Sequence, residues 1–170
     1  NDELASGSWD NSIIIWDLKS RSKKYKLEGH SGPVFSLVKL DNDELASGSG
    51  DKSIIIWDLK SRSKKYKLEG HSYSVLSLVK LDNDELASGS MDKSIIIWDL
   101  KSRSKKYKLE GHSNYVCSLV KLDNDELACG SLDNTIIIWD LKSRSKKYKL
   151  EGQDRKSTRL NSSHLVISYA

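Results

Sequence analysis

Histidine, serine and aspartate recur together along the chain, and these are the residue types of a nucleophilic catalytic triad. The first set contains His30, Ser47 or Ser49, Asp51 and, a little later, Trp57. In such a triad the aspartate orients the histidine, which takes the proton of the attacking serine hydroxyl. An active site needs one set in one cleft, whereas these sets recur at a spacing of 41 residues. We therefore expect a protein that is not an enzyme.

When they are buried, the same residue types can instead satisfy one another's hydrogen-bonding groups. Imidazole, hydroxyl, carboxylate and indole N–H supply matching donors and acceptors. Two serines on one strand face leave the hydroxyl partner open, and a cysteine at the first of these positions would weaken the network there. The later sets are His71, Ser88 or Ser90, Asp92 and Trp98, and then His112, Cys129 or Ser131, Asp133 and Trp139.

An apolar run that ends in Trp-Asp is the element that must position these side chains. Three consecutive isoleucines followed by tryptophan favour a β-strand that is buried on both faces, because alternate side chains point to opposite sides and both are apolar. Such a strand needs neighbours above and below it. The runs occupy residues 13–17, 54–58, 95–99 and 136–140.

Internal repetition organises the whole chain. Units that begin at Asn1, Asn42 and Asn83 are each 41 residues long, and a fourth begins at Asn124 and continues to Gly152. Each unit has four short apolar stretches that are bounded by Gly, Asp, Asn or Ser, which predicts four strands per unit and no helix.

Three Gly-His pairs precede the sets, at Gly29-His30, Gly70-His71 and Gly111-His112. Together with the Trp-Asp pairs they resemble the signature of the WD-repeat family, which builds β-propellers with one four-stranded blade per ~40 to 45 residues. The resemblance implies an all-β fold, a β-propeller fragment with three complete antiparallel blades and one partial blade. It also implies that the His, Ser, Asp and Trp of each set form a buried hydrogen-bond network. The implied blades fill residues 34–69, 75–110 and 116–151, and residues 3–28 supply the last three strands of an earlier blade.

The resemblance also sets the expected boundaries. Three blades and a part do not close a ring of about 4 to 8 blades, so we expect the native chain to be longer at both ends. Residues 154–170 share nothing with the repeat and resemble an in-frame translation of a widely used sequencing adapter, so we expect a non-native tail. The WD-repeat unit is then expected over residues 1–153, as a partial blade (1–29) and blades at 30–70, 71–111 and 112–152.

The two cysteines, Cys117 and Cys129, each replace a residue that other units fill with Phe, Leu or Ser, so neither belongs to a disulfide or metal-ligand pattern. We expect no cofactor and no metal. A reducing compartment is favoured, the cytoplasm first and the nucleus as the alternative. No apolar run approaches the ~20 residues that a membrane span requires.

Basic residues are concentrated in the KSRSKK segments between the third and fourth expected strands. The chain has 28 basic and 24 acidic residues, and without the three basic and one acidic residue of the tail 25 and 23 remain. The acidic turns beginning at Asp41 should project from the same rim and interleave with these segments as solvated ion pairs. The alternative is an electrostatic binder of RNA or anionic lipid through the basic rim. No aromatic interleaving or Gly-rich phosphate loop supports it, so we expect neither nucleic acid nor membrane as the partner.

Function is expected where the units differ, with neutral drift in a young repeat array as the alternative. Both variable segments should emerge at one end of each blade, opposite the basic rim. Exposed aromatic and large apolar side chains are typical of binding hot spots, so we predict an interaction scaffold that binds a protein or peptide through this face. An appended enzyme domain stays open. The predicted partner-binding residues are Trp9, Gly50, Met91 and Leu132 before the turn aspartate, and Pro33, Phe35, Tyr73, Ser74, Leu76, Asn114, Tyr115 and Cys117 after the Gly-His pairs.

Overall fold

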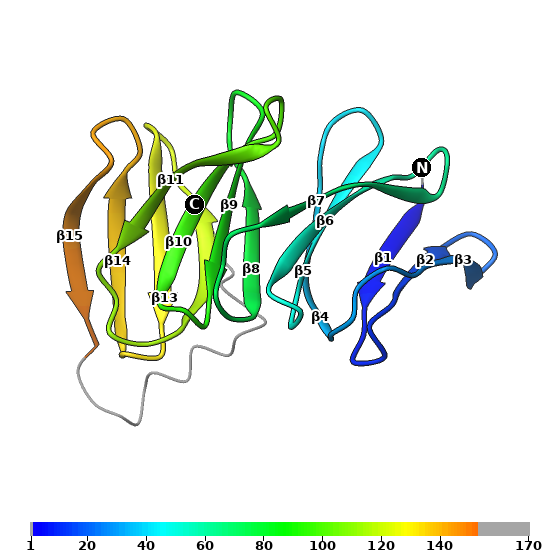
Figure 1. Ribbon diagram of the computed structural model, residues 1–170, viewed down its shortest axis with the longest axis horizontal. Coiled ribbons are helices and arrows are strands. Elements are labelled where there is room, and N and C mark those ends of the chain that lie inside the picture. The colour runs from blue at the N-terminus through cyan, green and yellow to red at the C-terminus, as the bar shows by residue number, and fades with distance from the viewer. Residues whose placement is uncertain (1, 153–170) are drawn as a thin grey trace.

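The computed structural model describes residues 2–152, in which every regular element is a β-strand (Figure 1). The strands form one three-stranded sheet and three four-stranded antiparallel sheets, each a meander of consecutive strands. These residues therefore contain no helix long and apolar enough to cross a membrane. The expected tail and Gln153 lie outside the described residues. The all-β, four-stranded prediction is confirmed.

The four sheets are named blades 1 to 4. Blade 1 contains β1 (Glu3–Gly7), β2 (Ile13–Asp17) and β3 (Ser22–Leu27). Blade 2 contains β4 (Val34–Lys39), β5 (Glu44–Ser49), β6 (Ser53–Asp58) and β7 (Ser63–Glu69). Blade 3 contains β8 (Val75–Lys80), β9 (Glu85–Ser90), β10 (Ser94–Asp99) and β11 (Ser104–Glu110). Blade 4 contains β12 (Val116–Lys121), β13 (Glu126–Ser131), β14 (Thr135–Asp140) and β15 (Ser145–Glu151).

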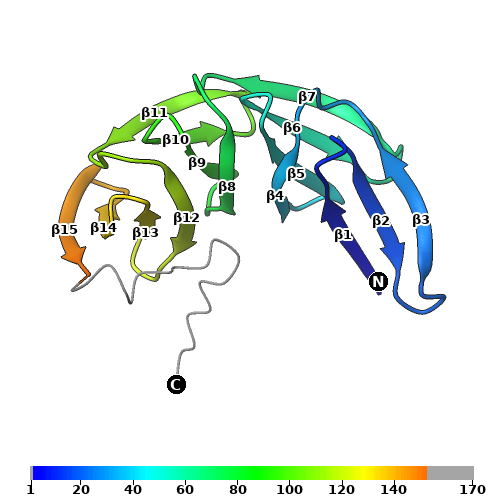
Figure 2. The ribbon, with the colours of Figure 1, turned by 90° about the horizontal axis from the view of Figure 1, so that it is seen from below.

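The blades stand side by side in an arc (Figure 2). The first strands β4, β8 and β12 lie on the concave side, and the last strands β3, β7, β11 and β15 form the convex side. The first strands of neighbouring blades contact one another along the concave side. The fold thus stacks sheets face to face, as the buried isoleucine runs predict.

The strand β6 shows why the run must be apolar on both faces. Ile54 and Ile56 pack into a cluster with Val75 and Trp98 from blade 3. Ile55 and Trp57 point the other way, into a cluster with residues of blade 1. All of these side chains are fully buried, with Trp57 only 1% exposed. Alternate residues of one strand therefore supply the core of two blade junctions.

Close approach between blades explains a glycine in the second strand. A Cβ atom at Gly48 would lie 2.7 Å from Cγ1 of Val75 in the next blade, and one at Gly89 would lie 2.7 Å from Cγ1 of Val116. These distances are shorter than a carbon–carbon contact allows. Any larger residue would push the neighbouring blade away, so the unit requires glycine at this position.

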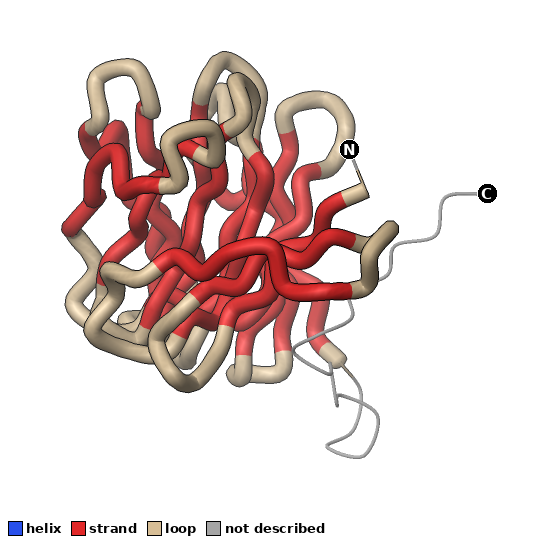
Figure 3. Tube along the Cα trace, turned by 90° about the vertical axis from the view of Figure 1, so that its right-hand side faces the viewer, coloured by secondary structure: helices blue, strands red, loops and turns tan. Residues whose placement is uncertain are grey.

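The loops gather at the two ends of the blades, as the tube view shows (Figure 3). At one end, the backbone N–H of Leu59 donates to the carbonyl of Asp43 (2.9 Å), which ties the third-to-fourth strand turn to the first-to-second strand turn. At the other end, the N–H of Gly50 donates to the carbonyl of Pro33 (2.8 Å). We call the first end the charged rim and the second the variable face. This arrangement follows directly from the meander.

Candidate functional site

Blade 2 joins its His, Ser, Asp and Trp in one buried network. Nδ1 of His30 lies 2.8 Å from Oδ2 of Asp51, and Nε2 lies 2.7 Å from Oγ of Ser47. The indole N–H of Trp57 donates to the same Ser47 oxygen at 2.8 Å. The network therefore links the loop before the first strand to the second and third strands of its own blade.

The hydroxyl partner that the sequence left open is Ser47 and not Ser49. The Ser49 hydroxyl donates to the carbonyl of Gly32 (2.8 Å) and accepts the N–H of Asp51 (3.1 Å). Its side chain thus fixes the two loops of the variable face, while the side chain of Ser47 holds the histidine and tryptophan. Blade 3 repeats the division, with Ser88 in the network and Ser90 bonded to the carbonyl of Tyr73.

A residue that sequence reasoning missed completes each network. The Ser53 hydroxyl donates to Oδ1 of Asp51 at 2.5 Å, and the Ser53 N–H donates to the same oxygen at 3.0 Å. An aspartate that bonds the backbone two residues on is typical of an Asx turn, so the Asp-x-Ser spacing carried this signal. Ser94 and Thr135 hold the same place beside Asp92 and Asp133.

The aspartates of the networks stay ionised to low pH. Burial raises the pKa of Asp51, but hydrogen bonds from Ser53, His30 and the N–H of Ser31 outweigh it and lower the pKa to about 2. Burial is outweighed by hydrogen bonds in the same way in the other two blades. The pKa of Asp133 is lowered to about 2, and the pKa of Asp92 falls below its ordinary value. These carboxylates are acceptors for the loop and are held as anions.

Asp51, His30 and Ser47 contact one another in the same sequence as the residues of a catalytic triad, but a substrate cannot reach them. Oδ2 of Asp51 contacts one histidine nitrogen and the Ser47 hydroxyl contacts the other, as a serine hydrolase requires. However, Ser47 is fully buried, and its oxygen also bonds to the indole and to the carbonyl of Ile55. A nucleophile in that position cannot reach a carbonyl carbon, so the geometry supports a structural role.

Blade 4 carries a cysteine in the network. Sγ of Cys129 lies 2.9 Å from Nε2 of His112, and the indole N–H of Trp139 donates to it at 3.1 Å. Burial raises the pKa of this thiol to about 12, so it stays neutral. A neutral, buried thiol is neither a nucleophile nor a metal ligand. In the part of the chain that the structure describes, no group of three or more His, Cys, Asp or Glu residues is placed to hold a metal ion.

The predicted partner-binding residues all lie at the variable face or on the first two residues of a first strand. Five are exposed: Trp9 (80%), Phe35 (36%), Tyr73 (60%), Tyr115 (38%) and Leu132 (55%). The other seven are half-buried, namely Gly50, Met91, Pro33, Ser74, Leu76, Asn114 and Cys117. None of the twelve is buried in the core.

Neighbouring blades bring these variable residues into contact. The rings of Trp9 in blade 1 and Phe35 in blade 2 meet edge to face, with centroids 5.7 Å apart. Between blades 2 and 3, the Nζ atom of Lys52 lies 5.7 Å from the centre of the Tyr73 ring. At these two junctions, exposed side chains of neighbouring blades therefore contact one another across the variable face.

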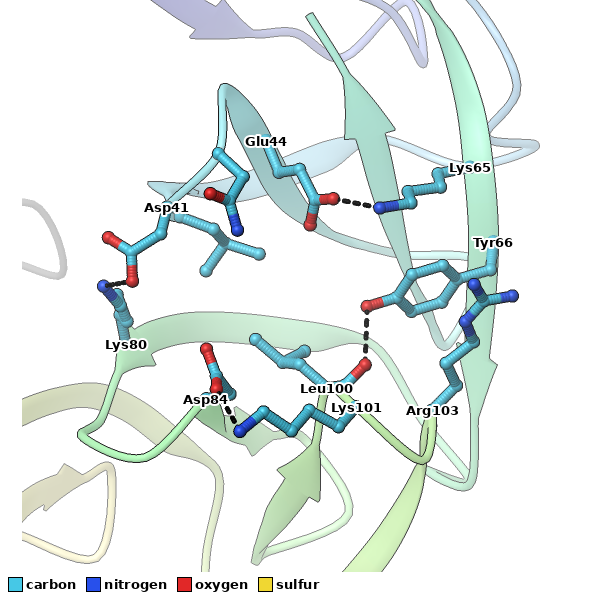
Figure 4. A pocket seen from close by; sticks show the side chains of 11 residues that line it. Asp41, Glu44, Lys65, Tyr66, Lys80, Asp84, Leu100, Lys101 and Arg103 are labelled. Atoms are coloured by element: carbon cyan, nitrogen blue, oxygen red, sulfur yellow. Dashed lines mark hydrogen bonds and ion pairs between the residues drawn. The ribbon is translucent and has the colours of Figure 1, made fainter.

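Ion pairs cover the charged rim, and Figure 4 shows one of its pockets. Lys65 pairs with Glu44, Lys80 pairs with Asp41, and Nζ of Lys101 lies 2.9 Å from Oδ2 of Asp84. The ionised groups of the rim thus interleave, as the sequence predicts for a solvated salt-bridged surface.

Comparisons with known proteins agree with this geometry. The family profile described as "WD domain, G-beta repeat" matches residues 1–17, 21–58, 62–99 and 103–140. The chain belongs to the WD-repeat family. The WD-repeat prediction from the Gly-His and Trp-Asp pairs is therefore confirmed. No curated protein sequence matches the chain significantly.

Two solved WD-repeat structures are similar to the chain. The structure titled "Structure of U3-55K" aligns with a TM-score of 0.82 and 28% identity, over 90% of this chain and 49% of that one. The crystal structure of the RRP9 WD40 repeats aligns with the same TM-score and identity, over 89% of this chain and 48% of that one. This WD-repeat chain therefore spans about half the length of these structures.

Proposed function

We propose that the protein is an interaction scaffold whose variable face binds a protein or peptide. One observation carries the proposal: the positions that differ between otherwise near-identical units lie at one end of the blades and include exposed aromatic rings, two of which contact each other across a blade junction. Aromatic side chains supply much of the energy of protein interfaces. WD-repeat propellers generally serve as protein-interaction scaffolds, which supports the proposal. The proposed site of action is the cytoplasm or the nucleus.

The backbone of the blades holds this face in a fixed shape. In blades 2, 3 and 4, the residue before the turn aspartate donates its N–H to the loop that enters the first strand, from Gly50 to Pro33, Met91 to Ser74 and Leu132 to Tyr115 (2.8 to 3.0 Å). In each of these blades, the buried network of His, Ser or Cys, Asp and Trp anchors both loops. Side chains can therefore change from unit to unit while their positions stay the same, which suits a recognition surface.

For the described residues we propose neither catalysis by the His, Ser and Asp sets nor binding of nucleic acid by the charged rim. The His, Ser and Asp side chains that could form a triad are buried within the blades. At the rim, Lys24, Lys65, Lys106 and Lys147 each pair with a glutamate. Lysines that are already paired release fewer counterions on binding phosphate, which weakens the case for an RNA- or lipid-binding rim.

The test replaces the variable face without touching the core. Trp9, Phe35, Leu76, Met91 and Tyr115 are changed to Ser in one variant, and proteins captured from a cell extract are identified and then purified for direct binding. We expect the partner that binds the parent protein to be lost, with stability changed by less than ~1 kcal/mol because these side chains lie outside the junction clusters.

The control variant neutralises the opposite end. Lys23, Lys24, Lys64, Lys65, Lys105 and Lys106 are changed to Gln, and binding is measured at low and high salt. We expect this variant to keep the partner at both salt concentrations. Retained binding after the variable-face changes, or loss of binding only in the Gln variant, would refute the proposal.

A further inference from the structure

The same pocket occurs at each of the three blade junctions, at the charged rim. The pocket between blades 2 and 3 has a volume of 310 Å³ (Figure 4), and those between blades 1 and 2 and between blades 3 and 4 have volumes of 400 and 270 Å³. The second and third junction pockets are lined by the first-to-second strand turn of one blade and the third-to-fourth strand turn of the next. The pocket between blades 1 and 2 is lined by strand residues of blade 1 and by the third-to-fourth strand turn of blade 2. They lie at the opposite end of the blades from the variable face.

An arginine stacked on a tyrosine forms one wall of each pocket. The guanidinium carbon of Arg103 in blade 3 lies 4.8 Å from the centre of the Tyr66 ring in blade 2 (Figure 4). The ring is fixed in turn, because its hydroxyl donates to the carbonyl of Leu100 at 3.3 Å. Arg62 over Tyr25 and Arg144 over Tyr107 repeat the stack at 4.8 and 4.6 Å. Stacking on the tyrosine ring occupies one face of the guanidinium, whereas the N–H groups at its edge can still donate hydrogen bonds to another partner.

In two of the three pockets, the other charges neutralise one another. Around Arg103, three lysines pair with Glu44, Asp41 and Asp84, which are the acidic side chains of that lining. Around Arg144, three lysines pair with Glu85, Asp82 and Asp125 in the same way. Among residues 2–152, no carboxylate forms an ion pair with Arg62, Arg103 or Arg144. In these two pockets one guanidinium therefore remains to bind an anion. In the pocket between blades 1 and 2, Lys24 and Lys60 pair with Glu3 and Asp43, and Arg62 remains together with Lys39.

The geometry points to three carboxylate-binding sites, which together bind an acidic polypeptide along the charged rim. A guanidinium binds a planar carboxylate with two parallel hydrogen bonds, and a single excess cation matches a single negative charge. Because the three carboxylates of the lining around Arg103 are each paired with a lysine, the pocket has no second excess cation for a dianionic phosphate monoester. The pockets recur once per blade junction, so side-chain carboxylates of one extended chain can occupy neighbouring pockets and bind more tightly than any one of them alone.

The test uses a fluorescein-labelled peptide of ten glutamates, a matched peptide of ten glutamines and a ten-nucleotide oligouridylate, with binding followed by fluorescence anisotropy. One variant carries Arg62→Gln, Arg103→Gln and Arg144→Gln. Its matched control carries Lys64→Gln, Lys105→Gln and Lys146→Gln, which removes the same charge from the same rim but from residues that do not line the pockets.

We expect the glutamate peptide to bind, the glutamine peptide not to bind, and the arginine variant to bind at least about tenfold more weakly. The lysine control should lose no more than about twofold, through the weaker overall field. Equal losses in the two variants, no binding of the glutamate peptide, or tighter binding of the oligouridylate would each overturn the inference. Because no variable-face residue is changed, failure here leaves the function proposed for that face intact.

Discussion

The Sγ atom of Cys129 lies 2.9 Å from Nε2 of His112, in the place that a serine hydroxyl holds in blades 2 and 3. A thiol is a weaker hydrogen-bond partner than a hydroxyl, both for the imidazole and for the indole N–H of Trp139. The network of blade 4 is thus chemically the weakest of the three.

We therefore expect Cys129→Ser to stabilise the protein by about 1 kcal/mol, because it restores two hydrogen bonds to a hydroxyl. The measurement is urea-induced unfolding followed by tryptophan fluorescence. The reverse change in blade 3, Ser88→Cys, is the control and should destabilise by a similar amount. A loss of stability on Cys129→Ser would show that sulfur packing outweighs hydrogen bonding at this position.

Acid should unfold the protein through the network aspartates. The folded pKa of Asp51 and of Asp133 is about 2, below the ordinary value of 3.8, and that of Asp92 is also lowered. A depressed pKa contributes stability that is fully present above the unfolded value and is lost as pH falls through the folded value. We expect stability to decline between about pH 4 and pH 2, by up to about 2 kcal/mol for Asp51.

The matched variants are Asp51→Asn, Asp92→Asn and Asp133→Asn, with thermal unfolding recorded from pH 7 to pH 2. Each should be less stable at pH 7 by ~1 to 3 kcal/mol, because its buried partners lose a charged acceptor. Each should also flatten the acid limb of the curve. An unchanged acid limb in the triple variant would place the acid sensitivity elsewhere.

Two lysines adopt a backbone conformation that suits asparagine better. Lys52 and Lys93 have φ of 70°, in the left-handed region, whereas the equivalent positions of the first and fourth units hold Asn11 and Asn134. Asparagine visits this region more readily than other side chains with a Cβ atom. We expect Lys52→Asn with Lys93→Asn to stabilise the protein by up to about 1 kcal/mol per site, because asparagine avoids part of the cost of the left-handed region, measured as a higher melting temperature. Asn134→Lys is the control and should lower it.

The burial of each tryptophan predicts how much stability its replacement by Ala should cost. Trp57 and Trp98 are 1% and 2% exposed between two blades, and replacing either by Ala should cost ~3 to 5 kcal/mol. Trp16 is half-buried in the described structure and bonds to Ser6, so Trp16→Ala should cost less in the polypeptide of residues 1–170. Equal losses at the three sites, measured by denaturant unfolding, would contradict the assignment of the junction clusters.

Most of the fold could be predicted because the unit repeats. A run such as residues 54–57 is apolar on both faces, so it is stable only as a strand packed between two apolar neighbours. The turn residues on either side of the run mark where the strand begins and ends. The choice of Ser47 over Ser49 could not be predicted, since both point to one side of β5 and only the loop position decides between them. The Arg–Tyr stacks were also missed, because they join residues of different units across a junction.

The glycine that each blade presents to its neighbour's valine has a consequence for the gene. The contact between Gly48 and Val75 recurs between Gly89 and Val116, and the Ser36 hydroxyl accepts the N–H of Leu78 just as the Ser77 hydroxyl accepts that of Leu119. Each junction is therefore interchangeable with the next. A whole unit gained or lost by unequal recombination would meet matching neighbours on both sides, so the contacts at the junctions would not oppose a change in copy number and closure of the ring would be the packing constraint that remains.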